Sequence, residues 1–212
     1  MSTSLLTLAD GAQLAITVNG TGRDLVLVSG LGGTAAFWEP VVPVLAQHFR
    51  VIRFDQRGIG KSKRGTAPVS IERLALDTLA VLEHVGSQDA LLLGHSTGGV
   101  ILQDLVLRDA SRVGGLVLSA TWARPNRYMA ELFRSRSVLL TTAPREYAAI
   151  GALIGYTPEW LDANWAKYEA AVAAGEEELR RWASQHLNVE IGLALMSDRW
   201  AGADYWEARG DK

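Results

Sequence analysis

The sequence contains no cysteine and only four histidines among its 212 residues. The first absence excludes disulfide bonds, thiolate nucleophiles and cysteine-ligated metal ions. The second leaves few candidates for an imidazole base. Any chemistry of this chain that needs a histidine therefore depends on a short list of side chains.

Long apolar runs and basic clusters are also missing. No apolar run reaches the roughly 18 residues of a membrane span. The opening segment MSTSLLTLADGAQL has neither the positive charge nor the long apolar core of a signal peptide. The net charge is -2, without any polybasic run, which argues against a nucleic-acid partner. We therefore expect a soluble, cytoplasmic protein that binds a small molecule and neither membranes nor nucleic acid.

Apolar runs and helical patterns alternate along the first part of the chain. With 212 residues, of which 48% are hydrophobic, it suits one domain or one domain with an insertion. Two short strands joined at Asp10-Gly11 predict a hairpin. The later strands are separated by helices, which predicts an α/β fold with a mostly parallel sheet covered on both faces. These strands are expected near residues 24–30, 50–55, 89–96 and 113–120, and the helices near residues 38–48, 70–86 and 98–109.

The rhythm changes near residue 121. From Ala123 to about Trp200 only helical patterns occur, and Thr157-Pro158 is typical of an N-cap followed by the first helical residue. Such a stretch indicates a helical cap inserted on an α/β body. We therefore expect a body over residues 1–122, a cap over 123–200 and a tail over 201–212.

The segment GHSTGG, Gly94–Gly99, matches the pattern G-x-S-x-G. An apolar run precedes it and a helical pattern follows it. In such an arrangement a sharp strand-to-helix turn lifts a serine hydroxyl above the sheet, and small neighbours let the backbones approach. The helix that begins there aims N–H groups at the site. The segment predicts that Ser96 is a nucleophile; the alternative is a glycine-rich turn with an idle serine.

A second glycine-rich segment, SGLGGTA over Ser29–Ala35, has two interpretations. It fits the dinucleotide fingerprint G-x-G-x-x-G/A, with Asp55 as the acid at the end of the next strand. It also fits a loop whose backbone N–H faces a reacting carbonyl group. Pro40 and Pro43 stand where the helix of a dinucleotide site should already run, which favours the second interpretation. Binding of NADH would revive the first.

A third segment, RGIGKS over Arg57–Ser62, resembles the end of a phosphate-binding loop. The full motif needs a glycine five residues before Gly60, but Asp55 occupies that position. The phosphate interpretation therefore fails, and the segment predicts a tight, solvated turn after a strand. No motif for a metal or cofactor is left, so we expect neither.

Four segments together resemble the α/β-hydrolase superfamily: LVSGLGG, FDQRGIGKS, GHSTGG and GLVLSAT occur in its order and spacing. The resemblance covers about residues 10 to 122, and the cap is similar only in being helical. The resemblance is greatest to small bacterial serine hydrolases with a helical cap, such as the carbamate/aminoacrylate hydrolases and the 3-oxoadipate enol-lactonases. The motifs are specific for the fold and weak for the substrate.

The resemblance implies an acyl-enzyme mechanism on a small ester, lactone or amide/carbamate. It makes Ser96 the nucleophile and gives the oxyanion hole to the backbone N–H groups of Leu31 and Thr97. It implies no cofactor and no metal. The residues expected around the substrate pocket are Gly30, Trp122 and Trp160.

The resemblance also places an acid and then a histidine after the cap, beyond Trp200. No histidine of this chain lies there. His95 precedes Ser96 on an extended strand and should point the other way, while the others fall in helical patterns. Beyond Met196 we expect solvated acids without a strand to present them. The histidines are His48, His84, His95 and His186, and the acids beyond Met196 are Asp198, Asp204 and Asp211.

Two expectations follow from the absence of strands after the cap. The strand near residues 113–120 becomes a sheet edge with an exposed apolar flank, and such edges recruit partners. We therefore expect a second copy of the chain or a complementary C-terminal fragment as a partner, or else a rearranged cap that covers this edge. The alternative function is a catalytically impaired or non-catalytic homologue that binds a ligand between cap and sheet.

Overall fold

The computed structural model describes the backbone of residues 1–184 and the side chains up to residue 176. Backbone contacts divide the chain into two compact units, with a break between Arg124 and Pro125. Each unit is described by itself. The expected tail over residues 201–212 and the end of the expected cap lie outside the described residues.

The first unit is built on a six-stranded sheet with the order β1-β2-β4-β3-β5-β6. β2 pairs antiparallel with both β1 and β4, whereas β3 pairs parallel with β4 and β5, and β5 with β6. The predicted α/β class, with a mostly parallel sheet and an N-terminal β-hairpin, is confirmed. The strands are β1 Ser2–Thr7, β2 Gln13–Asn19, β3 Arg23–Val28, β4 Phe49–Phe54, β5 Ala90–His95 and β6 Val113–Ser119.

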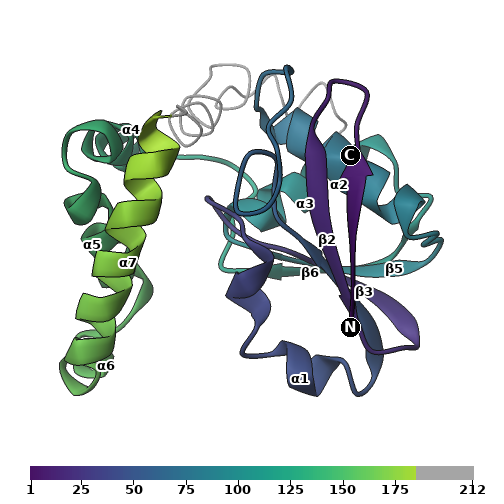
Figure 1. The fold of residues 1–212 in the computed structure, drawn as a ribbon, viewed down its shortest axis with the longest axis horizontal. Helices are drawn as coiled ribbons and strands as arrows, with labels where there is room; N and C mark the ends of the chain where they lie inside the picture. Colours follow the sequence, from purple (N-terminus) through teal and green to yellow (C-terminus); the bar gives the residue numbers. More distant parts are fainter. Residues whose placement is uncertain (185–212) are drawn as a thin grey trace. The chain divides into compact units, whose positions relative to one another are not determined.

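Two long helices, α2 Ile71–His84 and α3 Thr97–Arg108, lie on one side of the sheet (Figure 1). The predicted start of α2 is confirmed, because the Ser70 side chain accepts a hydrogen bond from the Arg73 backbone N–H. Gly86 follows α2 with φ +70°, the left-handed conformation in which helices commonly end.

The other side of the sheet has a thinner cover than the sequence predicted. Instead of one helix over residues 38–48, the structure has a 3-10 helix, η1 Ala35–Trp38, and a single α-helical turn, α1 Val42–Leu45. Pro40 falls between them; its missing N–H and its ring interrupt a helix at that point. Trp38 and Val42 pack on a core cluster with Leu25, Leu27 and Val51.

The described secondary-structure elements of the second unit are all helices, joined by short turns. Thr157 caps α6 by accepting a hydrogen bond from the Trp160 backbone N–H, with Pro158 at the first helical position, as predicted. Ala149, Leu161, Tyr168 and Val172 form a core cluster of this unit. No described helix of the protein is long and apolar enough to cross a bilayer. The helices of the second unit are α4 Arg127–Thr142, α5 Pro144–Gly155, α6 Pro158–Ala163 and α7 Trp165–Ser184.

The sheet ends in an apolar edge. Among the described strands β6 pairs with β5 alone. Three successive side chains of β6 are well exposed: Leu116 at 36%, Val117 at 51% and Leu118 at 44%. The expectation of an exposed apolar edge at this strand is confirmed for the described residues.

Candidate functional site

Ser96 forms the corner between β5 and α3. The strand ends at His95 and the helix begins at Thr97, so one residue makes the whole turn. Its backbone has φ 53° and ψ -124°, a conformation that costs a non-glycine residue on the order of 1–3 kcal/mol. Hydrogen bonds hold this corner, from the Ser96 N–H to the Ser119 carbonyl and from the Gly99 N–H to the Ser96 carbonyl, both 2.9 Å.

The glycines around Ser96 let the backbones approach closely. A Cβ atom at Gly94 would lie 2.6 Å from the carbonyl oxygen of Gly98, and one at Gly98 only 2.1 Å from that of Val28. Real Cβ atoms do not come so close to backbone oxygens. The G-x-S-x-G spacing is thus a steric requirement of the point where α3 starts between β3 and β5.

The loop after β3 runs directly beside Ser96. A Cβ atom at Gly30 would lie 3.1 Å from the Ser96 Cβ and 3.5 Å from its Oγ. Leu31 follows Gly30 in this loop, and Thr97 opens α3, whose first N–H groups have no acceptor within the helix. Ser96 itself is half-buried rather than packed in the core. The structure therefore brings two segments together, the loop that carries Gly30 and the corner that carries Ser96 and Thr97.

Gln56 fastens this loop, a role that the sequence did not reveal. Its Nε2 donates to the Ser29 carbonyl at 2.9 Å, and its backbone N–H donates to the Gly33 carbonyl at 2.9 Å. Ser29 Oγ donates to the Thr34 carbonyl at 2.8 Å. The loop is held on both sides of Gly30, which fixes the direction of its backbone N–H groups.

Asp55, the residue that follows β4, holds the same loop in place. Its Oδ1 accepts from the Ala35 N–H at 2.7 Å, and its Oδ2 accepts from the Lys61 N–H at 2.8 Å. In a dinucleotide site this acid would have to face a ribose, yet both of its oxygens are used by the protein backbone. Together with the 3-10 turn at η1, this contact argues against the dinucleotide interpretation.

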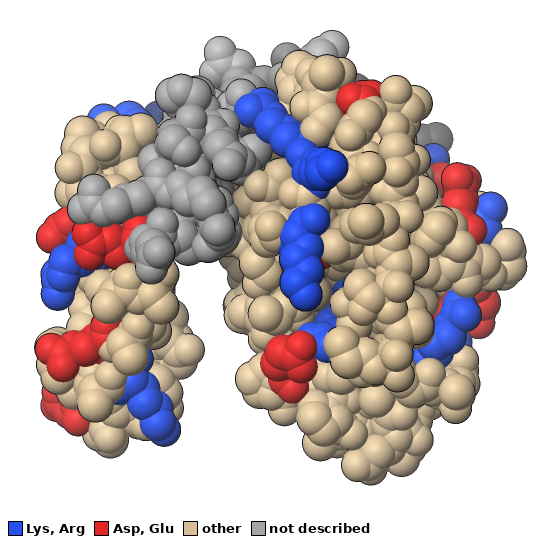
Figure 2. Space-filling model, viewed as in Figure 1, with Lys and Arg blue, Asp and Glu red and all other residues tan. Residues whose placement is uncertain are grey.

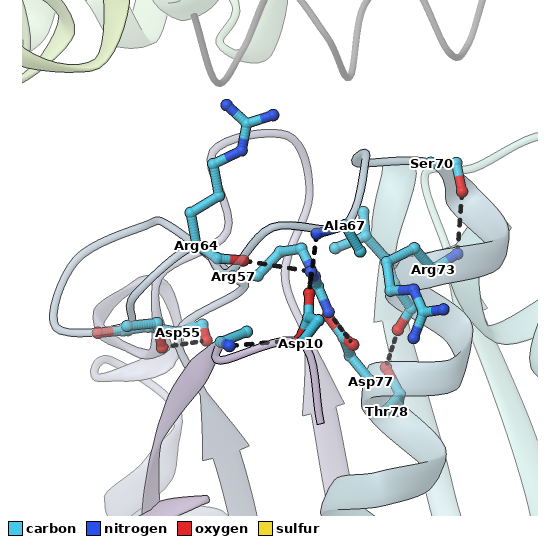
Figure 3. A network of polar contacts seen from close by, with 12 residues as sticks. Asp10, Asp55, Arg57, Arg64, Ala67, Ser70, Arg73, Asp77 and Thr78 are labelled. Carbon is cyan, nitrogen blue, oxygen red and sulfur yellow. Dashed lines mark hydrogen bonds and ion pairs between the residues drawn. The ribbon is translucent and has the colours of Figure 1, made fainter. Parts of the chain in front are cut away.

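Arg57 corrects the prediction of a solvated turn at RGIGKS. Its side chain is fully buried and binds the Asp77 carboxylate through two contacts of 2.6 Å. It also donates to Asp10 at 2.7 Å and to the Arg64 carbonyl at 3.2 Å, as Figure 3 shows. Ile59 is buried as well. The segment is therefore anchored by an internal ion network and not only solvated.

Asp10 has a strongly perturbed acidity in this network. Burial alone would raise its pKa, but the hydrogen bonds from Arg57 and from the backbone N–H groups of Ala67 and Ala12 outweigh it. Together they lower the pKa of Asp10 from 3.8 to about 2. The network ties the β1–β2 hairpin to α2 and to the loop after β4.

None of the histidines within residues 1–184 forms a hydrogen bond with Ser96. The His95 Nδ1 pairs with Ser119 Oγ at 3.2 Å, and its ring stacks on Phe37 with centroids 5.1 Å apart. His84 contacts Ser4 at 3.4 Å, and His48 is exposed. The other candidates for base and acid lie outside the described residues: His186, Asp198, Asp204 and Asp211.

The two tryptophans expected at a pocket belong to different units. Trp122 follows β6 and is half-buried, and its carbonyl accepts from Gln103 Nε2 at 3.0 Å. Trp160 lies on α6, partly exposed, and stacks on Tyr156 with centroids 4.1 Å apart. A shared role of these residues around a substrate stays a prediction. In the described part of the chain no three acidic or histidine side chains cluster as metal ligands do.

Comparison with known proteins gives one family. Residues 25–200 match the model of the alpha/beta hydrolase fold. The RutD protein of Azorhizobium caulinodans, named for carbamate hydrolysis, is 36% identical over 159 residues, covering 74% of this chain and 60% of that protein. The RutD protein of Pseudomonas savastanoi is 33% identical over 180 residues, covering 80% of this chain and 70% of that protein. The chain spans about three fifths of the length of several curated relatives it matches.

Solved structures agree with these matches. A hydrolase from Pseudomonas aeruginosa PA01 is 30% identical with a TM-score of 0.70, covering 89% of this chain and 72% of that one. An enol-lactonase from Burkholderia xenovorans LB400 is 26% identical with a TM-score of 0.71, covering 88% and 73%.

Proposed function

The chain belongs to the α/β-hydrolase fold family, as its motifs predicted, and from this premise we propose that it is a serine hydrolase with Ser96 as the nucleophile. One observation carries the proposal: Ser96 occupies a strained strand-to-helix corner directly beside the loop of Gly30. Strain at one residue, held by surrounding hydrogen bonds, is a common property of active sites. The names of the relatives, with their carbamate hydrolases and an enol-lactonase, support a hydrolytic reaction.

The proposed reaction is acyl transfer to water. The Ser96 oxygen attacks the carbonyl carbon of a small ester, lactone or amide/carbamate, and negative charge develops on the carbonyl oxygen. The N–H groups of Leu31 and Thr97 stabilise that charge. Collapse of the intermediate breaks the bond to the alcohol or amine and leaves an acyl ester on Ser96, which water then hydrolyses. Gly30 and Trp122 are the proposed pocket residues of the first unit.

The proton of Ser96 needs a base. The described histidines do not supply it, so we place base and acid outside the described residues or on a complementary fragment. The same observation favours the second candidate function, a non-catalytic homologue that binds a ligand. An oxyanion hole without a base retains roughly 10³–10⁴-fold catalysis over water, far less than a working triad.

Partner and location are proposals of the same kind. The exposed apolar edge at β6 supports pairing with a second copy or with a complementary fragment. For the location we propose the cytoplasm, where proteins rarely rely on disulfides; the sequence has no cysteine.

A fluorophosphonate probe followed by peptide mapping tests the proposed function. Rapid labelling confined to the Ser96 peptide is expected, because the probe reacts only with an activated hydroxyl. Ser96→Ala should abolish labelling, while the matched variant Ser119→Ala should retain it. If the folded protein is not labelled, the ligand-binding alternative replaces the hydrolase.

A further inference from the structure

The first unit contains a hollow of about 270 Å³ that is separate from Ser96. β1, β2 and β4 form its floor, and the segment from Thr34 to Glu39 and the loop at Lys61 form its walls. Neither Ser96 nor Gly30 lines it. The hollow exists because η1 and α1 are only four residues long each and pack over β3 and β4.

Three polar side chains stand in one row on this floor. Thr3 of β1 is the register partner of Thr17 on β2, and Thr17 is the register partner of Arg53 on β4. Side chains of directly paired residues lie on the same face of a sheet. Two hydroxyl groups and a guanidinium group therefore face the same hollow.

Arg53 has more N–H donors than acceptors. It is only 2% exposed. Nη1 contacts the Ala35 carbonyl at 3.0 Å and the Glu39 carboxylate at 2.8 Å, and Nη2 reaches Asn19 at 3.4 Å. Its buried Nε has no hydrogen-bond partner among the described residues. A buried cationic group with an unused donor calls for a further acceptor.

Glu39 is a weakly held partner for so buried a cation. Its side chain is 61% exposed, and exposed carboxylates contribute little to ion pairs because water competes for them. Asp55 is already engaged by the backbone, because each of its oxygens accepts an N–H group. A carboxylate from outside can therefore compete with Glu39 for Arg53.

The wall adds a second positive charge. Lys61 lines the hollow, is exposed, and forms no ion pair within the described part of the chain. Figure 2 shows lysine and arginine side chains following one another down this unit, with an acidic side chain below them. Such a stripe raises the local concentration of anions.

We propose that this hollow binds a small carboxylate that carries a second polar group. Its carboxylate takes the place of Glu39 at Arg53, close to Lys61, and the hydroxyl groups of Thr3 and Thr17 bind its other end. A guanidinium group matches the planar geometry of a carboxylate. The volume of about 270 Å³ lies just below the usual range of ligand pockets, which restricts the occupant to a small molecule.

Titration of the ¹⁵N-labelled protein with succinate tests the site. The side-chain Nε–H signal of Arg53, assigned with Arg53→Lys, should shift and saturate. Neutral succinamide, and sodium chloride at equal ionic strength, should leave it unchanged. An unchanged signal with succinate, or an equal response to phosphate, would overturn the proposal of a carboxylate site.

Three exposed-site variants separate specific binding from general attraction. Lys61→Gln should weaken succinate binding about two- to fivefold, the loss of one solvent-exposed ionic contact. Lys63→Gln changes the same charge in the same loop without lining the hollow and should leave affinity unchanged. Glu39→Gln should tighten binding severalfold, because it removes the competing carboxylate. Equal effects of the two lysine variants, or no gain with Glu39→Gln, would contradict the proposed geometry.

Discussion

Gly30 lies against Ser96, so closely that a Cβ atom added at Gly30 would stand 3.1 Å from the Ser96 Cβ and 3.5 Å from its hydroxyl oxygen. The two residues are far apart in the sequence and belong to loops at the ends of neighbouring parallel strands. Their contact joins the predicted nucleophile to the loop that carries Leu31. A side chain at Gly30 would therefore push the Ser96 side chain or the loop aside by a few tenths of an ångström.

Gly30→Ala should slow labelling of Ser96 about tenfold or more, since displacements of around 1 Å at a reacting group can cost about a hundredfold. The backbone at Gly30 is not left-handed, so the free energy of unfolding should change by less than about 1 kcal/mol. Probe kinetics and chemical denaturation measure the two effects. Gly155→Ala, where a Cβ meets nothing within 4 Å, is the control; equal labelling rates in both variants would show that Gly30 does not shape the site.

Gln56→Ala should loosen the loop beside Ser96. The change leaves the buried Ser29 carbonyl without the donor that now lies 2.9 Å away, at a cost of about 1–3 kcal/mol. Labelling of Ser96 should slow by about ten- to a hundredfold, because Leu31 loses its fixed direction. Gln47→Ala, at an exposed position, should change neither quantity. If the variant is as stable as the parent and is labelled at the same rate, Gln56 does not support the site.

Acid should destabilise the protein through Asp10. The pKa of Asp10 is lowered to about 2 in the folded state from 3.8, so its stabilising effect is complete above pH 4. The effect is lost as the pH falls from about 4 to about 2. Asp10→Asn should therefore lower Tm at neutral pH and flatten its decline on acidification. Thermal melts against pH measure this, with Asp162→Asn on α6 as an exposed control that keeps the decline.

The sequence predicted elements with a local signal better than contacts between distant residues. Ser70, Gly86 and the serine corner carry cap and turn chemistry that is visible within a few residues. Pro40 is a local helix-breaking signal as well, but the helix predicted over residues 38–48 did not take it into account. That prediction was wrong. Arg57 shows the other limit. Nothing near it reveals that Asp10 and Asp77 meet it, because chain topology brings them together.

The site follows the same division. The motif around Ser96 was visible, whereas the support of its neighbouring loop by Gln56 depends on β4 lying beside β3. A single glutamine in a loop belongs to no sequence pattern that predicts a contact with a distant backbone carbonyl. The sequence did not identify a base, and none of the described histidines serves as one. His84 contacts Ser4, His95 contacts Ser119, and His48 is exposed.

The edge strand β6 should determine the association state. Val117 is the most exposed of its apolar side chains, and the strand has one unpaired side among the described residues. Unpaired strand edges recruit further strands, and a lysine on such an edge opposes pairing. The parent protein should therefore associate with increasing concentration in sedimentation velocity runs, and Val117→Lys should stay monomeric.

Leu107→Lys is the matched control for this experiment. Leu107 is equally apolar and 47% exposed, but it lies on α3 rather than on the sheet edge. If association depends on strand pairing, this variant should behave like the parent. Should both lysine variants become monomeric, general hydrophobic attraction drives association. Should the parent be monomeric at every concentration, pairing with a second copy is excluded, and a complementary fragment becomes the partner to test by co-expression.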